Sequence, residues 1–156
     1  MINRSMLCIL LTSFTSLISI NATAVEQEIF DDWALKCQQS CYIYQGMKSK
    51  NQNTIFSLQV SKVSNEIVAM QLNFPLGLYI PAGIGIALGD FKKSIPLTTC
   101  LPIGCRALLV LNDEIKGQIE RSNKVKVRFF TTQSQEKEIS FSLKGFQNAF
   151  NAMNKK

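Results

Sequence analysis

The 156-residue sequence contains no histidine. Histidine is the most frequent general base in enzymes and a very common zinc ligand, so its absence excludes Ser-His-Asp and Cys-His catalysis. Two adjacent acidic pairs are present, Asp31-Asp32 and Asp113-Glu114. Neighbouring side chains diverge on an extended backbone, and we interpret both pairs as surface or helix-capping residues. The sequence therefore predicts no catalytic residues, no cofactor and no bound metal.

Motifs that bind nucleotides are also lacking. Gly83-Ile84-Gly85 could begin a dinucleotide fingerprint, but the third glycine of that pattern would fall at Leu88. No Walker A sequence, calcium loop or internal repeat is present. The lysines and arginines are scattered, which is typical of a solvated surface, and we predict no nucleic-acid partner. The formal net charge of +6 leaves a weak attraction to anionic lipid or lipopolysaccharide surfaces as an alternative.

The first 24 residues have the order of a secretory signal peptide. Arg4 supplies the positive charge, an apolar run extends from Leu7 to Ile20, and Ala22-Thr23-Ala24 has the small residues of a cleavage site. The run is shorter than the ~20 apolar residues of a membrane-spanning helix. We predict cleavage after Ala24. Residues 25–156 then form a single exported domain, with a net charge of +5 once Arg4 is removed from the full chain's +6.

Four cysteines follow this leader: Cys37, Cys41, Cys100 and Cys105. An even number of cysteines in an exported domain indicates disulfides. Of the three pairings we favour the local one, Cys37–Cys41 and Cys100–Cys105, because a proline and a glycine between the last two cysteines favour a tight reversal. The cross pairing and a zinc site of all four cysteines are alternatives. A thioredoxin-like redox centre is disfavoured, since neither pair has C-x-x-C spacing.

The body of the chain has the period-two alternation of half-buried strands. The alternating stretches are residues 33–37, 56–60, 68–74, 125–129 and 139–143. Two shorter apolar runs, Ile84 to Leu88 and Ala107 to Leu111, are interpreted as strands buried on both faces. Asn112 and the residues after it predict a short helix, and a stripe of apolar residues from Phe146 predicts a C-terminal helix. We therefore predict a mainly β protein, an antiparallel β-sandwich or barrel with one short connecting helix and a C-terminal helix.

Prolines and glycines punctuate the apolar segment 73–90, so it cannot form a continuous helix or a central strand. We favour an arrangement in which this segment packs against the sheets. In the alternative, Leu76, Leu78 and Tyr79 are exposed as a surface for a partner.

Three segments, in order along the chain, resemble the invasion associated locus B family of bacterial exported proteins. They are FPLGLYIPAG at residues 74–83, TTCLPIGC at 98–105 and SLKGF at 142–146. Trp33 and the two cysteines that follow it fit the beginning of the family pattern. The resemblance therefore covers almost all of the chain after the leader.

The resemblance implies a protein of the periplasm or outer membrane of a Gram-negative bacterium, linked to entry into host cells, with no known catalytic residues. We infer a non-enzymatic role in host-cell invasion or virulence, exerted through contacts with an unidentified protein or cell-surface partner. The candidate surface consists of Leu76, Leu78, Tyr79, Lys92 and Lys93. The alternatives are an envelope housekeeping or chaperone-like module and a carbohydrate- or lipid-binding module. Peripheral association with the outer membrane fits each role, and no oligomeric state is predicted.

Overall fold

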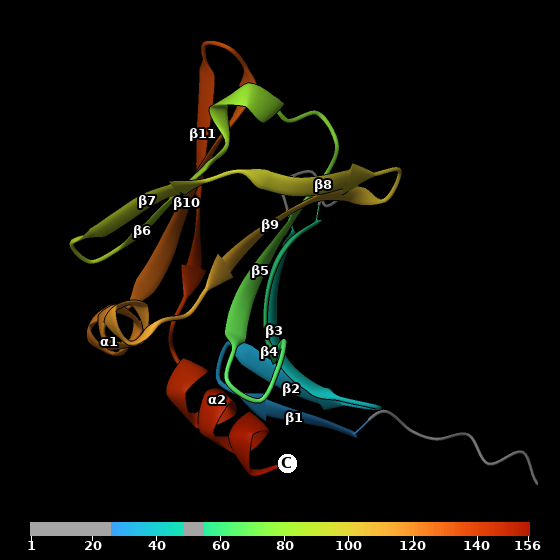
Figure 1. Ribbon diagram of the computed structural model, residues 1–156, viewed down its shortest axis with the longest axis vertical. Helices are drawn as coiled ribbons and strands as arrows, with labels where there is room; N and C mark the ends of the chain where they lie inside the picture. Colours follow the sequence, from blue (N-terminus) through green and yellow to red (C-terminus); the bar gives the residue numbers. More distant parts are fainter. Residues whose placement is uncertain (1–25, 49–54) are drawn as a thin grey trace, which may run out of the picture.

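The computed structural model describes residues 26–48 and 55–156, which form two antiparallel sheets packed in a sandwich-like arrangement (Figure 1). The fold is mainly β, as the alternation predicts, and the sheets do not close into a barrel. The predicted signal peptide, residues 1–24, lies outside the described residues.

The larger sheet has seven strands in the order β1-β2-β3-β4-β5-β9-β8. Its first five strands follow the chain as a meander, and β9 then pairs with β5 and carries β8 to the far edge. The strands are β1 (Glu26–Phe30), β2 (Trp33–Cys37), β3 (Cys41–Lys48), β4 (Ile55–Lys62), β5 (Val68–Phe74), β8 (Leu97–Leu101) and β9 (Gly104–Val110).

The smaller sheet has four strands in the order β11-β10-β6-β7. A one-turn 3-10 helix, η1 (Ile80–Ala82), leads into it from the larger sheet. The strands are β6 (Ile84–Leu88), β7 (Phe91–Ile95), β10 (Lys124–Thr132) and β11 (Gln135–Ser142). Buried side chains from both sheets meet in one core, which includes Trp33, Leu58, Leu72, Ile86 and Val127.

The connecting helix α1 (Asp113–Arg121) begins where the sequence predicts it. The side chain of Asn112 accepts a hydrogen bond of 2.9 Å from the backbone N–H of Ile115, which satisfies one of the free donors of the first turn. Ile115 and Ile119, four residues apart, are the buried residues of this helix. Helix α1 therefore packs through one face beside β6.

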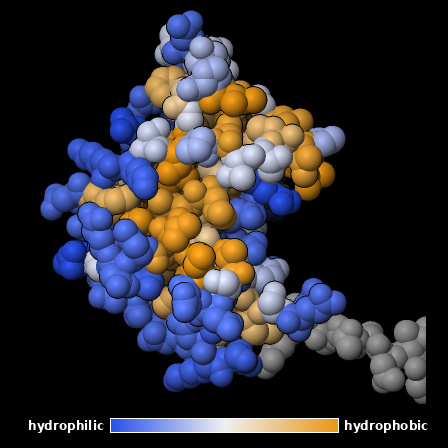
Figure 2. All heavy atoms as spheres, in the orientation of Figure 1, coloured by the Kyte–Doolittle hydropathy of each residue, from blue (hydrophilic) through white to orange (hydrophobic). Residues whose placement is uncertain are grey.

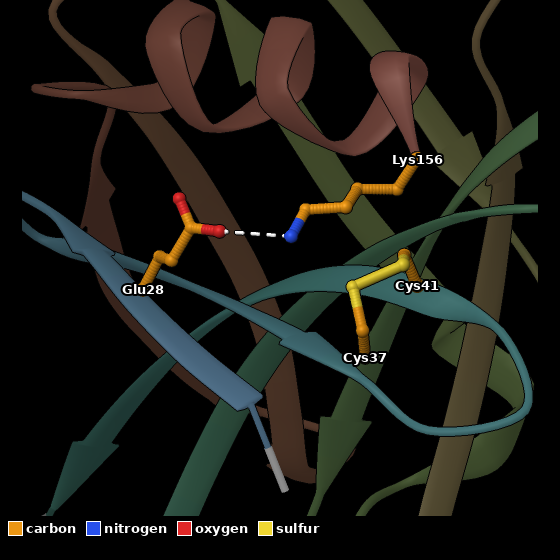
Figure 3. The surroundings of a disulfide bond; sticks show 4 residues. All are labelled: Glu28, Cys37, Cys41 and Lys156. Carbon is orange, nitrogen blue, oxygen red and sulfur yellow. Dashed lines mark ion pairs between the residues drawn. A yellow bond between two sulfur atoms is a disulfide. The ribbon is translucent and has the colours of Figure 1, made fainter.

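The C-terminal helix α2 (Phe146–Lys155) packs against β1, β2 and β3. The rings of Phe146 and Trp33 meet edge to face at 5.0 Å, and the indole N–H of Trp33 donates to the backbone oxygen of Ser142 at 2.9 Å. Figure 3 shows Lys156 directed from the end of this helix toward Glu28 of β1, at 3.2 Å, near the Cys37–Cys41 disulfide. This ion pair thus connects the C-terminal residue to the first strand of the described chain.

The two apolar runs that were predicted to be buried on both faces are buried on one face only. In β6 only the alternate residues Ile84, Ile86 and Leu88 are fully buried. In β9, Leu108 and Val110 are exposed on the outer face of the larger sheet. Apolar outward residues made these strands look uniformly apolar, and the sequence pattern could not distinguish an exposed leucine from a buried one.

Candidate functional site

Two segments from distant parts of the sequence meet at one end of the larger sheet. Phe74, the last residue of β5, pairs in register with Cys105 near the start of β9. Gly104 has φ +137°, and a Cβ at this position would overlap the carbonyl oxygen of Phe74. The glycine therefore allows the β8–β9 hairpin to lie directly against the chain at Phe74 and Pro75.

At this end of the sheet, three exposed apolar side chains lie on the β8–β9 hairpin or on the loop beside it, and we call them the apolar tip: Leu76, Leu101 and Ile103. Ile103 is 82% exposed, Leu76 is 56% exposed and Leu101 is 46% exposed. Figure 2 shows hydrophobic residues gathered at the upper right, where Figure 1 places the β8–β9 hairpin. A single exposed leucine is ordinary, whereas two aliphatic side chains on one projecting hairpin, with a third on the neighbouring loop, indicate a contact surface.

The Cys100–Cys105 disulfide closes the hairpin that carries Leu101 and Ile103. The Cα atoms of the two cysteines are 4.0 Å apart, and Cys105 is buried in the hydrophobic core while Cys100 is exposed. The bond therefore fixes the tip to the core, and its exposed side chains are held in place before any partner binds. The structure also contains the other bond of the favoured local pairing, Cys37–Cys41.

The five residues predicted as a partner surface do not form one surface. Leu76 belongs to the apolar tip, but Leu78 packs against the core and Tyr79 is only partly exposed. The backbone N–H of Tyr79 donates to the oxygen of Phe130 at 2.7 Å, which draws this part of the loop onto β10. The loop therefore begins with an exposed residue, Leu76, and continues with Leu78 and Tyr79, which pack against the rest of the protein.

Lys92 and Lys93 are exposed but distant from the tip. They lie on β7, an edge strand of the smaller sheet, and Figure 1 shows the β6–β7 hairpin directed away from the β8–β9 hairpin. Because successive strand residues alternate between faces, the two lysines also face opposite sides of that sheet. The prediction that they share a surface with the Leu76 loop is therefore not supported by the geometry.

Leu101 and Ile103 were missed because the CLPIGC sequence was interpreted only as a closed turn. A signal was present: turn residues between two cysteines are normally polar, and here they include two large aliphatic side chains. Apolar residues in a short closed turn cannot all reach the core.

The acidic pairs that could have served catalysis are engaged in local structure. Asp31, in the β1–β2 turn, pairs with Lys144 at 3.0 Å, and Asp113 pairs with Lys116 in the first turn of α1 at 3.1 Å. The hydrogen bond from Lys144 to Asp31, together with the charge of Asp31, raises the pKa of Lys144 above its usual 10.5. Over residues 26–48 and 55–156, no group of three or more acidic or cysteine side chains is placed to hold a metal ion.

Within the described part of the chain, none of the helices has the length and hydropathy to cross a membrane.

Comparisons with known proteins agree on one family. The family model described as "Invasion associated locus B (IalB) protein" matches residues 32–154. The crystal structure of invasion associated protein B from Bartonella henselae is similar in fold, with a TM-score of 0.73 at 17% sequence identity, over 83% of this chain and 96% of that one. A search of curated proteins found no match. Since the family match covers most of the sequence, the chain belongs to the invasion associated locus B family of exported bacterial proteins.

Proposed function

We propose that the protein contributes to host-cell invasion as a non-enzymatic binding protein, and that its apolar tip contacts a protein partner. The description of its family names a locus associated with invasion and no reaction. The fold and the family match support a contact role.

One observation carries this proposal. Two of the segments through which the sequence resembles its family, residues 74–83 and 98–105, lie far apart in the chain and come together at the apolar tip. Leu101 and Ile103 stand on a hairpin that a disulfide and a buried cysteine hold in one conformation, and Leu76 lies on the loop beside it. A preformed apolar projection binds a partner with little loss of conformational entropy.

The proposal is tested with purified protein lacking residues 1–24 and carrying Leu101→Ser together with Ile103→Ser. Burying an aliphatic side chain contributes about 1.5–3 kcal/mol, so losing two of them should weaken binding to host cells at least about tenfold. The matched control is Val63→Ser, which removes a 61% exposed valine beyond the opposite end of β4. Labelled protein bound to host cells is measured by flow cytometry, and invasion by counting intracellular bacteria. Equal binding by the double variant and the control would refute the tip as the contact.

We also propose that the protein resides in the periplasm or on the outer membrane of a Gram-negative bacterium. The signal-peptide pattern supports export, and two disulfides suit an oxidising compartment. The test is biotin and protease accessibility on intact cells, with a known periplasmic protein as the control. Labelling of this protein while the control stays protected would support direct contact with host molecules. Protection equal to that of the control would rule out direct contact with host molecules and favour an indirect role in the envelope.

A further inference from the structure

A second surface, far from the apolar tip, contains a cavity of about 360 Å³. It lies at the outer face of the smaller sheet, beside the C-terminal end of α1. Figure 2 shows mainly hydrophilic residues on this side, at the left of the molecule, where Figure 1 places β6, β7 and α1. The walls are formed by four cations and two polar residues: Lys92, Arg121, Lys124, Lys126, Ser122 and Asn123.

The strand register explains why these cations surround an open space. Ala87 of β6 pairs with Lys92 on one side and with Lys126 on the other, so a small side chain lies between two long ones. Gly89, at the following turn, adds no side chain to the cavity wall. Val125 and Val127 face the core, so Lys124 and Lys126 face outward on the same side. The result is a trough with a small-residue floor and basic walls.

The charge of this cavity is unbalanced. Its lining contains no carboxylate, and only Lys126 has an ion pair, with Glu138 at 3.6 Å on the exposed surface. In the part of the chain that the structure describes, Lys92, Arg121 and Lys124 form no ion pair. The C-terminal end of α1 contributes about half a negative charge, which is small beside four cations. A bound anion would relieve the mutual repulsion of these groups.

Ser122 adds a second observation at the same place. Its hydroxyl oxygen is buried and, among the described residues, is the one such side-chain oxygen without a hydrogen-bond partner. A Cβ at Gly89 would lie 3.1 Å from this oxygen, so the missing side chain leaves room for the hydroxyl. Buried hydroxyl groups are nearly always hydrogen-bonded, so this oxygen is an unmet hydrogen-bonding group beside the cavity.

We propose that this cavity binds a phosphomonoester carried on a small polar molecule such as a sugar. A phosphomonoester has nearly two negative charges at neutral pH and three acceptor oxygens, which suits a cavity lined by several Lys and Arg side chains better than a single carboxylate does. A cavity of about 360 Å³ lies near the lower end of the ~300–1000 Å³ range of small-molecule sites and has room beyond one phosphate group. Asn123 can hydrogen-bond the hydroxyl groups of the carrier.

The first experiment titrates the protein lacking residues 1–24 with glucose 1-phosphate by calorimetry at low ionic strength, with glucose as the uncharged probe. Binding should be measurable for the phosphate ester, absent for glucose, and weaker as salt increases. Lys92→Ala should reduce affinity about tenfold, since a charge-assisted hydrogen bond is worth at least a decade in affinity. Its matched control is Lys93→Ala, which removes the same charge from the neighbouring residue on the opposite face and should change little.

Equal weakening by the two lysine variants would overturn the proposal, because it would indicate general charge attraction. Binding of glucose as tight as that of its phosphate ester would overturn it as well. Lys92 is exposed, so its variant should keep the thermal midpoint of the parent protein. The Leu101→Ser, Ile103→Ser double variant should keep its affinity for glucose 1-phosphate, which separates this site from the apolar tip.

Two further probes distinguish the sources of the phosphate. Inorganic phosphate should bind more weakly than glucose 1-phosphate, because the sugar also occupies part of the cavity. Equal affinity for the two would contradict a contribution of the sugar to binding.

Vesicles of phosphatidylcholine with phosphatidic acid test a membrane-anchored phosphomonoester, with phosphatidylcholine alone as the control. Vesicle binding that is sensitive to Lys92→Ala but not to Lys93→Ala would support a lipid-linked source at this same cavity. Vesicle binding that is insensitive to both, with no binding of the soluble ester, would refute the site.

Discussion

The two disulfide-closed turns of the larger sheet have nearly the same geometry and opposite chemistry. The Cα atoms are 4.1 Å apart in Cys37–Cys41 and 4.0 Å apart in Cys100–Cys105. The first bond encloses Gln38-Gln39-Ser40, whereas the second encloses Leu101-Pro102-Ile103-Gly104. The bond alone therefore does not mark a functional surface. The residues between the cysteines decide whether a closed turn is a polar hairpin end or an apolar projection.

The surroundings of the two turns differ in the same way. The first turn belongs to the part of the sheet that α2 covers, and the ion pair of Lys156 with Glu28 lies near it (Figure 3). The second turn extends beyond the sandwich, and its backbone is fixed by the contact of Gly104 with Phe74. An ion pair thus lies beside one turn, while close backbone packing supports the other.

Disrupting the contact of Gly104 with Phe74 should have the largest effect on stability. Gly104→Ala should lower the free energy of unfolding by about 3 kcal/mol, because a side chain would meet both an unfavourable φ and the carbonyl oxygen of Phe74. The matched control is Gly77→Ala, which also has a positive φ but no heavy atom within 4 Å of the added Cβ, and should cost about 1 kcal/mol. Denaturant titration measures both, and equal losses would contradict the close approach.

Removing each disulfide separately should affect stability similarly and binding differently. Replacing both cysteines of either pair with alanine should lower the free energy of unfolding by roughly 2 kcal/mol, since both loops are short and of similar length. Binding to host cells should fall only when Cys100 and Cys105 are replaced. If the loss of Cys37–Cys41 reduces binding equally, the tip is not a separate surface. Paired denaturation and binding measurements decide this.

Removing the Lys144–Asp31 ion pair should have the smallest effect on stability. Asp31 raises the pKa of Lys144, so the stabilisation from this pair is present below the ordinary lysine pKa of 10.5 and is lost as the pH rises through the higher folded value. Lys144→Met should therefore lower the thermal midpoint slightly near neutral pH and make no difference in strong alkali. A constant difference across the whole range would indicate lost packing instead. Thermal scans on both proteins from neutral to alkaline pH provide the measurement.

Much of the fold could be predicted from the sequence because its signals are local. The alternation in 33–37 and 125–129 marks strands, Asn112 is an N-cap beside α1, and the stripe from Phe146 gives α2. The edge strand β8 was missed, since its residues are almost all exposed and carry no alternation of buried and polar positions. Its place in the sheet depends on pairing with β9, which a local pattern does not reveal.

The candidate site was predicted only in part, for a related reason. Leu76 was identified because an apolar residue between proline and glycine is conspicuous in the sequence. Its neighbours on the tip, Leu101 and Ile103, come from a hairpin about 25 residues later, and only the pairing of β5 with β9 brings them to the same end of the sheet. Lys92 was identified as a surface residue, but its cationic neighbours depend on the register of β6, β7 and β10.

The packing of α2 on the first strands also determines when an exported chain can finish folding. Trp33, in the second strand, is fully buried by contacts that include Phe146 and the backbone of Ser142, more than 100 residues later. A chain that crosses a membrane N-terminus first therefore delivers its hairpin of β1 and β2 long before the helix that covers it. We expect the hairpin to stay open until α2 emerges, so that the chain remains unfolded during translocation and folds only once it is complete. The fluorescence of Trp33, the single tryptophan of the sequence, would report that last step.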